Sequence, residues 1–230
     1  MKNLPLFGLF LALSFLSKAQ DCAKMHDYFK EGVSMEYTDY DDKGKVTGMR
    51  TQKVTRIYKS RDTLVAVVES ILKNKKGKET SKGTFPIKCL SGTIFMDCRS
   101  VTPSQEQTRQ RDDMEVEIRS IDQRFPYKMS VGQSLPDAEL ETTIRLRGLQ
   151  LFHSIFLIKN RKAEAEETVT TAAGTYNCMR VSYDVEFQAM GNRTIHTVCW
   201  YSQSVGMVKS INYDKKGKEE NRQELTTFVK

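Results

Sequence analysis

The sequence has few of the residues that mark an active site or a metal centre. It contains only three histidines, His26, His153 and His196, and none forms an H-x-H or H-E-x-x-H pattern. A G-x-S-x-G nucleophile motif is missing, and no glycine loop follows the strand–loop–helix order of a nucleotide site. We therefore expect a protein that is not an enzyme and that uses no cofactor or metal ion.

Long apolar runs are also scarce, apart from one at the N-terminus. Residues 1–19, MKNLPLFGLFLALSFLSKA, begin with a basic residue and end with the small residues Ser17 and Ala19, as in a cleaved signal peptide. The apolar core of this segment is too short for a transmembrane span. Cys22 does not follow a small residue, which disfavours lipidation. We expect export to the periplasm, outer envelope or extracellular space, with residues 20–230 as a single domain.

Charge of one sign is not concentrated anywhere in the chain. Without the signal peptide, 34 basic residues stand against 29 acidic ones, a net charge of +5, and the two signs are mixed. This mixture excludes a basic nucleic-acid-binding arm. A solubility surface is the simpler interpretation, and attraction to an anionic envelope component is the alternative.

The five cysteines do not form a C-x-x-C pair, which argues against a thioredoxin-like site or a zinc knuckle. An exported protein meets an oxidising compartment, where disulfides form. The number is odd, so at least one cysteine stays free or bonds another molecule. The sequence leaves the pairing open among Cys22, Cys89, Cys98, Cys178 and Cys199.

A short basic motif occurs three times. Residues 40–45 read YDDKGK, residues 74–79 read NKKGKE, and residues 213–220 read YDKKGKEE. In each copy Asp or Asn opens a type I turn and Gly takes a positive φ, as in a hairpin with a glycine bulge. A calcium loop is the alternative, but lysine stands at positions that would have to be ligands. We expect three hairpins.

Two further hairpins are expected. Residues 84–98 turn about Ser91-Gly92, which places Cys89 opposite Ile94 and too far along the strand from Cys98 to bond it. Residues 177–203 turn about Gly191-Asn192. In that register, one face carries Met179, Val181, Tyr183, Val185, Phe187, Val198 and Trp200, and the other carries Cys178 and Cys199. Long-range disulfides or free thiols are therefore favoured over hairpin disulfides.

One segment predicts a helix, at about residues 103–121. Thr102 and Gln105 form a capping box around Pro103, and Met114, Ile118 and Ile121 recur at helical spacing. This helix either packs on the sheet or acts as a mobile lid.

The most apolar stretch after the signal peptide is LQLFHSIFLI, residues 149–158. As a strand it would be apolar on both faces, so it would be sandwiched or would line a hydrophobic cavity. Ile155 lies on one face and Phe156 on the other. A helix is the alternative, because a short apolar run does not fix the period.

The sequence also resembles a known family. EGVSMEYTDYDDKGKVTG, KNRKAEAEETVTTAAGTYNCMRVSYDV and WYSQSVGMVKSINYDKKGKEE resemble stretches of TapB-like, domain-of-unknown-function secreted proteins of Bacteroidetes, although Ala172 stands where that pattern has proline. Such proteins are distantly similar to the envelope lipoprotein carriers LolA and LolB. The resemblance implies an incomplete antiparallel β-barrel around a helix, and it carries no functional residue over.

The predicted fold is thus mainly β, an antiparallel incomplete (open) barrel of about ten strands with one central amphipathic helix. We expect it to bind a lipid or other hydrophobic or amphipathic envelope molecule, helped by nine methionines after the signal peptide. The alternative is a protein-interaction or structural module that uses an exposed sheet edge. The residues expected to face the ligand are Met114, Ile118, Ile155, Met179, Val181, Tyr183, Val185 and Phe187.

Overall fold

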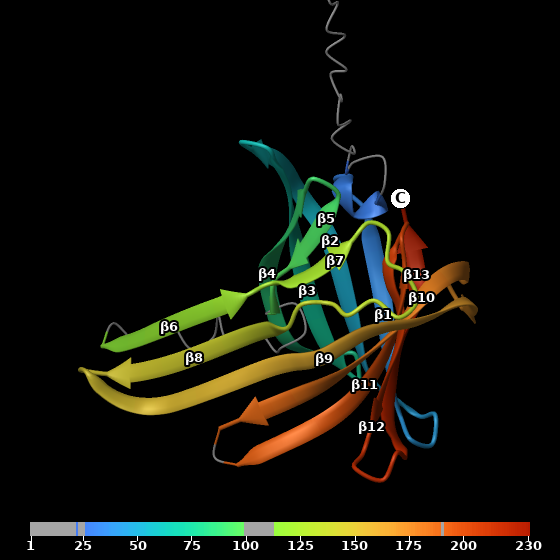
Figure 1. The fold of residues 1–230 in the computed structure, drawn as a ribbon. Helices are drawn as coiled ribbons and strands as arrows, with labels where there is room; N and C mark the ends of the chain where they lie inside the picture. Colours follow the sequence, from blue (N-terminus) through green and yellow to red (C-terminus); the bar gives the residue numbers. More distant parts are fainter. Residues whose placement is uncertain (1–21, 23–25, 99–112, 190) are drawn as a thin grey trace, which may run out of the picture.

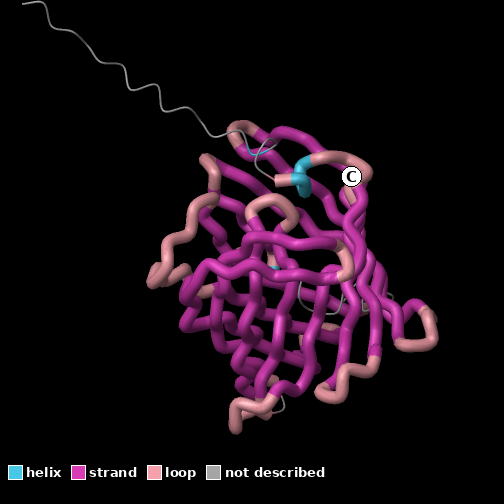
Figure 2. Tube along the Cα trace, turned by 90° about the vertical axis from the view of Figure 1, so that its right-hand side faces the viewer, coloured by secondary structure: helices cyan, strands magenta, loops and turns pink. Residues whose placement is uncertain are grey.

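One antiparallel sheet of thirteen strands organises the protein in a computed structural model that describes residues 22, 26–98, 113–189 and 191–230. The sheet curls into a nearly closed barrel (Figures 1 and 2). The only helical element with defined bounds in the described part is the 3-10 turn η1 (Asp27–Phe29). The strands are β1 (Ser34–Asp41), β2 (Val46–Ser60), β3 (Thr63–Asn74), β4 (Glu79–Leu90), β5 (Thr93–Met96), β6 (Met114–Ile121), β7 (Gln123–Pro126), β8 (Ala138–Leu146), β9 (Leu149–Thr171), β10 (Gly174–Gln188), β11 (Asn192–Ser202), β12 (Gly206–Tyr213) and β13 (Glu219–Val229).

The strand order joins two meanders. Strands β1 to β5 pair in sequence, strands β8 to β13 pair in sequence, and β13 pairs with β1. Tyr37 lies opposite Leu225 at that junction, and both side chains are fully buried. The first and last strands of the domain therefore close one side of the barrel.

The opposite side is closed by a chain segment that changes partners. Strand β6 pairs with β8, and β7 pairs with β5, although only Asp122 separates β6 from β7. The two strands lie almost end to end in Figure 1. Arg161 of β9 reaches across this seam and donates hydrogen bonds to the carbonyl oxygens of Arg124 (3.3 Å) and Pro136 (2.7 Å).

Strands β6, β8 and the first half of β9 extend beyond the barrel as a projecting arm (Figure 1). The 23 residues of β9 run from the tip of this arm into the barrel wall. We call the part of the sheet formed by β6, β8 and Leu149–Phe156 the arm. Its inner face is continuous with the barrel interior, because the same strand continues into the wall.

The three basic motifs are hairpin turns, as predicted. Their glycines, Gly44, Gly77 and Gly217, have φ values of 75°, 76° and 76°. The Asp41 carboxylate accepts hydrogen bonds from the backbone N–H groups of Lys43 and Lys45, and the equivalent Asn and Asp of the other two turns do the same. The side-chain oxygens of Asp41, Asn74 and Asp214 thus satisfy their own turns, which accounts for the motif without a cation.

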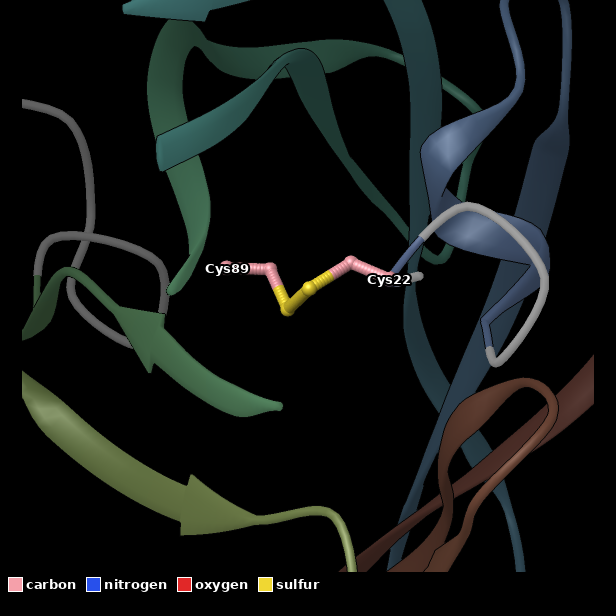
Figure 3. Close-up of a disulfide and its surroundings, with 2 residues drawn as sticks. All are labelled: Cys22 and Cys89. Atoms are coloured by element: carbon pink, nitrogen blue, oxygen red, sulfur yellow. A yellow bond between two sulfur atoms is a disulfide. The ribbon is translucent and has the colours of Figure 1, made fainter. Parts of the chain in front are cut away.

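The hairpin at 84–98 also follows the prediction. Leu90 pairs with Thr93 and Cys89 with Ile94. Cys89 forms a disulfide with Cys22, 67 residues earlier in the chain, and this bond ties the N-terminal segment to β4 (Figure 3). The other cysteines, Cys98, Cys178 and Cys199, are free thiols and buried. Long-range pairing and free thiols, the outcomes favoured from the sequence, are both confirmed.

The predicted register of the second hairpin is wrong. Gln188 pairs with Asn192, so the loop has three residues, 189–191, instead of two. This change moves every partner on β11 by an odd number of positions, which exchanges its two faces. Cys199 therefore lies opposite Val181 on the inner face, while Val198 and Trp200 face outward.

The predicted helix is wrong where the structure can test it. Met114–Ile121 is strand β6, while residues 99–112 lie outside the described residues. Met114 and Ile118 are four residues apart, a spacing that shares a face in a helix and in a strand alike. Ile121 distinguishes the strand from the helix. A helix would place it on the face of Met114 and Ile118, but it lies on the outer face of the strand and is 51% exposed. The count of about ten strands is also too low.

The apolar stretch at 149–158 is a strand, the start of β9, and not a helix. Within the described residues, no helix is both long and apolar enough to pass through a membrane.

Candidate functional site

The barrel encloses a cavity of about 320 Å³. Both meanders contribute to it, the first through β1, β2, β4 and β5 and the second through β9 to β13. The cavity lining divides into an apolar part and a polar part, which come from different strands.

The apolar part of the lining comes mainly from β4, β5, β9, β10 and β11. Ile87 and Ile158 are almost fully buried, and Phe156, Val185 and Ile195 are half-buried. The apolar and aromatic lining residues are Tyr37, Phe85, Ile87, Met96, Phe156, Ile158, Tyr183, Val185, Ile195, Tyr201 and Met207.

The polar part comes from β1, β2, β11, β12 and β13. Its members are Asp39, Arg50, Gln52, Thr197, Ser210, Asn212, Asn221 and Gln223. A row of hydrogen bonds runs across three strands: the Thr197 hydroxyl donates to Asn212 Oδ1 (2.8 Å), and Asn212 Nδ2 donates to Asn221 Oδ1 (2.8 Å). Cross-strand pairing places these three side chains in register.

Two ionised side chains of opposite sign lie in this polar part. Asp39 Oδ1 accepts a hydrogen bond of 2.6 Å from Gln223 Nε2. Burial lowers the pKa of Arg50, while attraction to Asp39 and Tyr37 opposes that shift. Gly48 leaves room for the acidic group, because a Cβ there would lie 3.3 Å from Asp39 Oδ2.

Two tyrosines, Tyr183 and Tyr201, line one wall of the cavity, and the buried thiol of Cys199 contacts them. The Tyr183 hydroxyl and Cys199 Sγ are 3.1 Å apart. Burial raises the pKa of Cys199 to about 11 and raises the pKa values of Tyr183 and Tyr201 well above their ordinary range. All three groups are therefore protonated at neutral pH, so this wall is uncharged and Cys199 is not a thiolate nucleophile.

The inner face of the arm extends the apolar part of the cavity. Strand pairing places one apolar row on the side of Phe156 and Val185, and several of its members are partly exposed, with Leu149 at 68% and Phe187 at 43%. The row consists of Met114, Val116, Ile118, Ile144, Leu146, Leu149, Phe152, Phe156 and Phe187. The cavity thus opens onto a half-exposed apolar surface.

The predicted ligand-facing residues have different positions. Tyr183 and Val185 line the cavity. Met179 and Val181 are buried on the same face of β10, outside the cavity lining. Ile155 pairs with Glu141 and lies on the outer face, because its neighbour Phe156 faces inward. Met114 and Ile118 lie on the inner face of the arm, and Phe187 lies beside the arm on β10, opposite Phe156. Contact of any of them with a ligand stays a prediction.

The polar part of the cavity was missed from the sequence. The alternation of Met35 and Tyr37 on the inner face of β1 extends directly to Asp39, which would have revealed one member. Arg50 and Gln52 follow the same rule on β2, where Val54 marks the buried face. The signal was present, but polar residues on an inward face are hard to distinguish from a strand end.

The described residues contain no group of three or more His, Cys, Asp or Glu side chains that could hold a metal ion. Two histidines instead form isolated pairs on the outer surface. His153 Nε2 is 3.0 Å from Glu141, and His196 Nδ1 is 2.9 Å from Asp184. Neither pair has a nucleophile beside it among the hydrogen bonds of the described part.

Comparison with known proteins places this fold in a family. The sequence profile of the DUF3108-like family matches residues 30–225. The chain belongs to the DUF3108-like family. No curated protein matches the sequence of this DUF3108-like protein.

Two crystal structures share its fold. One is a predicted exported protein with a YmcC-like fold from Bacteroides fragilis, which is 20% identical in sequence. The superposition covers 87% of this chain and 97% of the Bacteroides chain, with a TM-score of 0.71. The other is a predicted lipoprotein from Parabacteroides distasonis, which is 21% identical in sequence. The superposition covers 91% of this chain and 100% of the Parabacteroides chain, with a TM-score of 0.71. At these identities the comparison establishes the fold. The narrower TapB-like resemblance and the LolA/LolB likeness stay predictions.

Proposed function

We propose that this DUF3108-like protein is an exported, non-enzymatic protein that binds a hydrophobic or amphipathic molecule in its barrel. The observation that carries the proposal is the cavity of about 320 Å³, which combines an apolar wall with a small set of polar groups. Small-molecule sites have this character, and their volumes begin at about 300 Å³.

The partly exposed inner face of the arm supports the same function. Isolated surface residues such as one exposed leucine need no explanation, whereas several apolar side chains on one face next to a cavity do, here with the buried Thr142 and Ser154 among them. Phe156 belongs to both the cavity and the row, so a ligand longer than the cavity would continue along the arm. A carrier of an amphipathic envelope molecule would need such a surface.

Export has separate support. Residues 1–19 have the pattern of a signal peptide. The Cys22–Cys89 disulfide is suited to an oxidising compartment. The two structural relatives are described as a predicted exported protein and a predicted lipoprotein. Together these observations favour the bacterial envelope as the site of action.

One observation favours a protein-interaction module as the second candidate. Among the described residues, β6 pairs with β8 on one side and with no other strand. An eight-residue edge could accept a strand from a partner protein. This candidate does not use the polar cavity, so ligand binding separates the two proposals.

The test uses cavity-filling and matched control variants. Val185 and Ile155 are both half-buried, on adjacent strands, and face opposite sides of the sheet. Protein purified from its native envelope should release a bound amphiphile in mass spectrometry, and delipidated protein should regain stability when monoacylglycerol is added. At a hundredfold excess over Kd, the gain should be about 2.7 kcal/mol.

Val185→Trp should abolish this gain, and Ile155→Trp should retain it. Circular dichroism of both variants checks that they fold, and Val185→Phe provides a smaller replacement if the tryptophan variant does not. If no molecule co-purifies and no apolar or amphipathic compound shifts the melting temperature, the binding function is refuted and the interaction module takes its place.

A further inference from the structure

We infer that the ligand of the cavity carries an uncharged, hydrogen-bonding head group, such as the glycerol or amide of a neutral amphiphile. This inference rests on the proposed function and specifies its ligand class. It follows from the charges, the hydrogen-bonding groups and the position of the polar part of the lining.

The charges of the described lining residues are one of each sign. Among the described residues that line the cavity, Asp39 and Arg50 are the only ionised side chains. An anionic head group would be attracted by Arg50 and repelled by Asp39, and a cationic one would meet the reverse. Removing an ionised group from water has a large desolvation penalty, and a lining with no net charge offers little to offset it.

The hydrogen-bonding groups, in contrast, are plentiful. Gln52 is 8% exposed and lines the cavity, and no hydrogen bond joins its side-chain amide to the rest of the described chain. Asn221 Oδ1 accepts one hydrogen bond from Asn212, which leaves the Asn221 amide group with donors to spare. Hydroxyl, ester and amide groups of a ligand pair well with such side chains.

The position of these groups sets the direction of the ligand. The polar residues lie on β1, β2, β11, β12 and β13, whereas the apolar residue Phe156 lies on β9, which continues into the arm, and Val185 lies on the neighbouring strand β10. The head group therefore points toward β1 and β2. The apolar body contacts β9 and β10 and leaves the cavity along the inner face of the arm.

The experiment compares three probes of one chain length at pH 7.5: a monoacylglycerol, the corresponding fatty acid, and the corresponding primary alkylamine. Their dissociation constants are measured by displacement of a fluorescent apolar probe, below the concentration at which each forms micelles. We expect the monoacylglycerol to bind about tenfold more tightly, or better, than either charged probe.

A charge-switch variant adds a second readout. Asp39→Asn preserves the shape of the side chain and the oxygen that accepts from Gln223, and it leaves the lining with a net positive charge. Fatty-acid affinity should rise about tenfold, while monoacylglycerol affinity changes less than about threefold. Asp184→Asn on the outer face should change neither affinity.

The outcomes separate the two levels of the proposal. If the fatty acid or the alkylamine binds as tightly as the monoacylglycerol, or if Asp39→Asn leaves the preference unchanged in a folded protein, the head-group inference is overturned and the binding function stands. If none of the probes and no other apolar compound binds the wild-type protein, the binding function itself is overturned.

Discussion

Removal of the Cys22–Cys89 disulfide should destabilise the protein strongly, although the bond lies outside the cavity. The perturbation is the double variant Cys22→Ala/Cys89→Ala, compared with reduction of the wild-type bond. Reduction acts on this bond alone, because Cys98, Cys178 and Cys199 are already free thiols.

The magnitude follows from the length of the loop that the bond closes. The two cysteines are separated by 67 residues. In the chain-entropy treatment, a loop of this length restricts the unfolded chain by about 4 kcal/mol at 25 °C. For a domain of about 200 residues, this corresponds to a fall of roughly 8–16 °C in melting temperature. The double variant should lose slightly more, because Cys89 is buried and alanine leaves a small void.

The assay is equilibrium unfolding in urea, followed by fluorescence of the single tryptophan, Trp200. Its indole N–H donates to Glu167 Oε2 at 2.7 Å, so unfolding changes its surroundings. Reductant should lower the midpoint for wild-type protein and leave the double variant unchanged. The m-value should rise when the bond is absent, because the unfolded chain expands.

Two results would refute this reasoning. A loss below about 1 kcal/mol, outside the usual range for a native disulfide, would mean that the bond does not restrict the unfolded chain as its loop length implies. A double variant that still responds to reductant would mean that another disulfide forms in solution. Peptide mapping without reduction identifies which cysteines are bonded.

The remaining predictions concern Gly48 and His26. Gly48→Ala should lower the free energy of unfolding by about 1–3 kcal/mol, because the new Cβ would lie 2.9 Å from the Lys73 carbonyl oxygen. The control Gly191→Ala, whose Cβ would have no atom within 4 Å, should be nearly neutral in the same urea titration. Burial lowers the pKa of His26 from its ordinary value of 6.5, against the opposing effects of the Gln203 backbone and Asp27. The unfolded chain then binds the proton more readily, so stability present above pH 6.5 is lost as the pH falls through the folded-state pKa. His26→Gln should reduce the pH dependence of the melting temperature in that window. An unchanged pH dependence would refute the assignment to His26.

Local sequence patterns predicted several hairpins because the information is contiguous. A turn such as YDDKGK places its acceptor, its lysines and its glycine within six residues, and Asp41 caps the turn by itself. The same holds for Ser91 and Gly92, whose positive φ values fix a two-residue connection and hence the position of Cys89. On β1, the alternating residues Met35 and Tyr37 likewise coincide with the buried face.

The spacing of apolar residues was ambiguous where the helical period and the strand period place the same residues on one face. Met114 and Ile118 share a face in either a helix or a strand, and a capping sequence before them favoured the helix. Pairing with β8 decides for a strand, because all eight residues are in register with β8 and the backbone groups that point toward β8 find partners there. Tertiary pairing of this kind overrides local propensity.

The sequence by itself determined the mainly β class, the basic hairpin turns, the hairpin at 84–98 and the preference for long-range or free cysteines, because each depends on neighbouring residues or on the number and spacing of the cysteines. The partner of Cys89, the three-residue loop that turns Cys199 inward, and the meeting of Asp39, Arg50 and Val185 around one cavity became visible in the folded chain alone. These features require contacts between distant parts of the chain, such as the hydrogen bond from Thr226 to the Glu36 carbonyl across 190 residues. Closure of the sheet brings such residues together, and no local pattern encodes the register in which it closes.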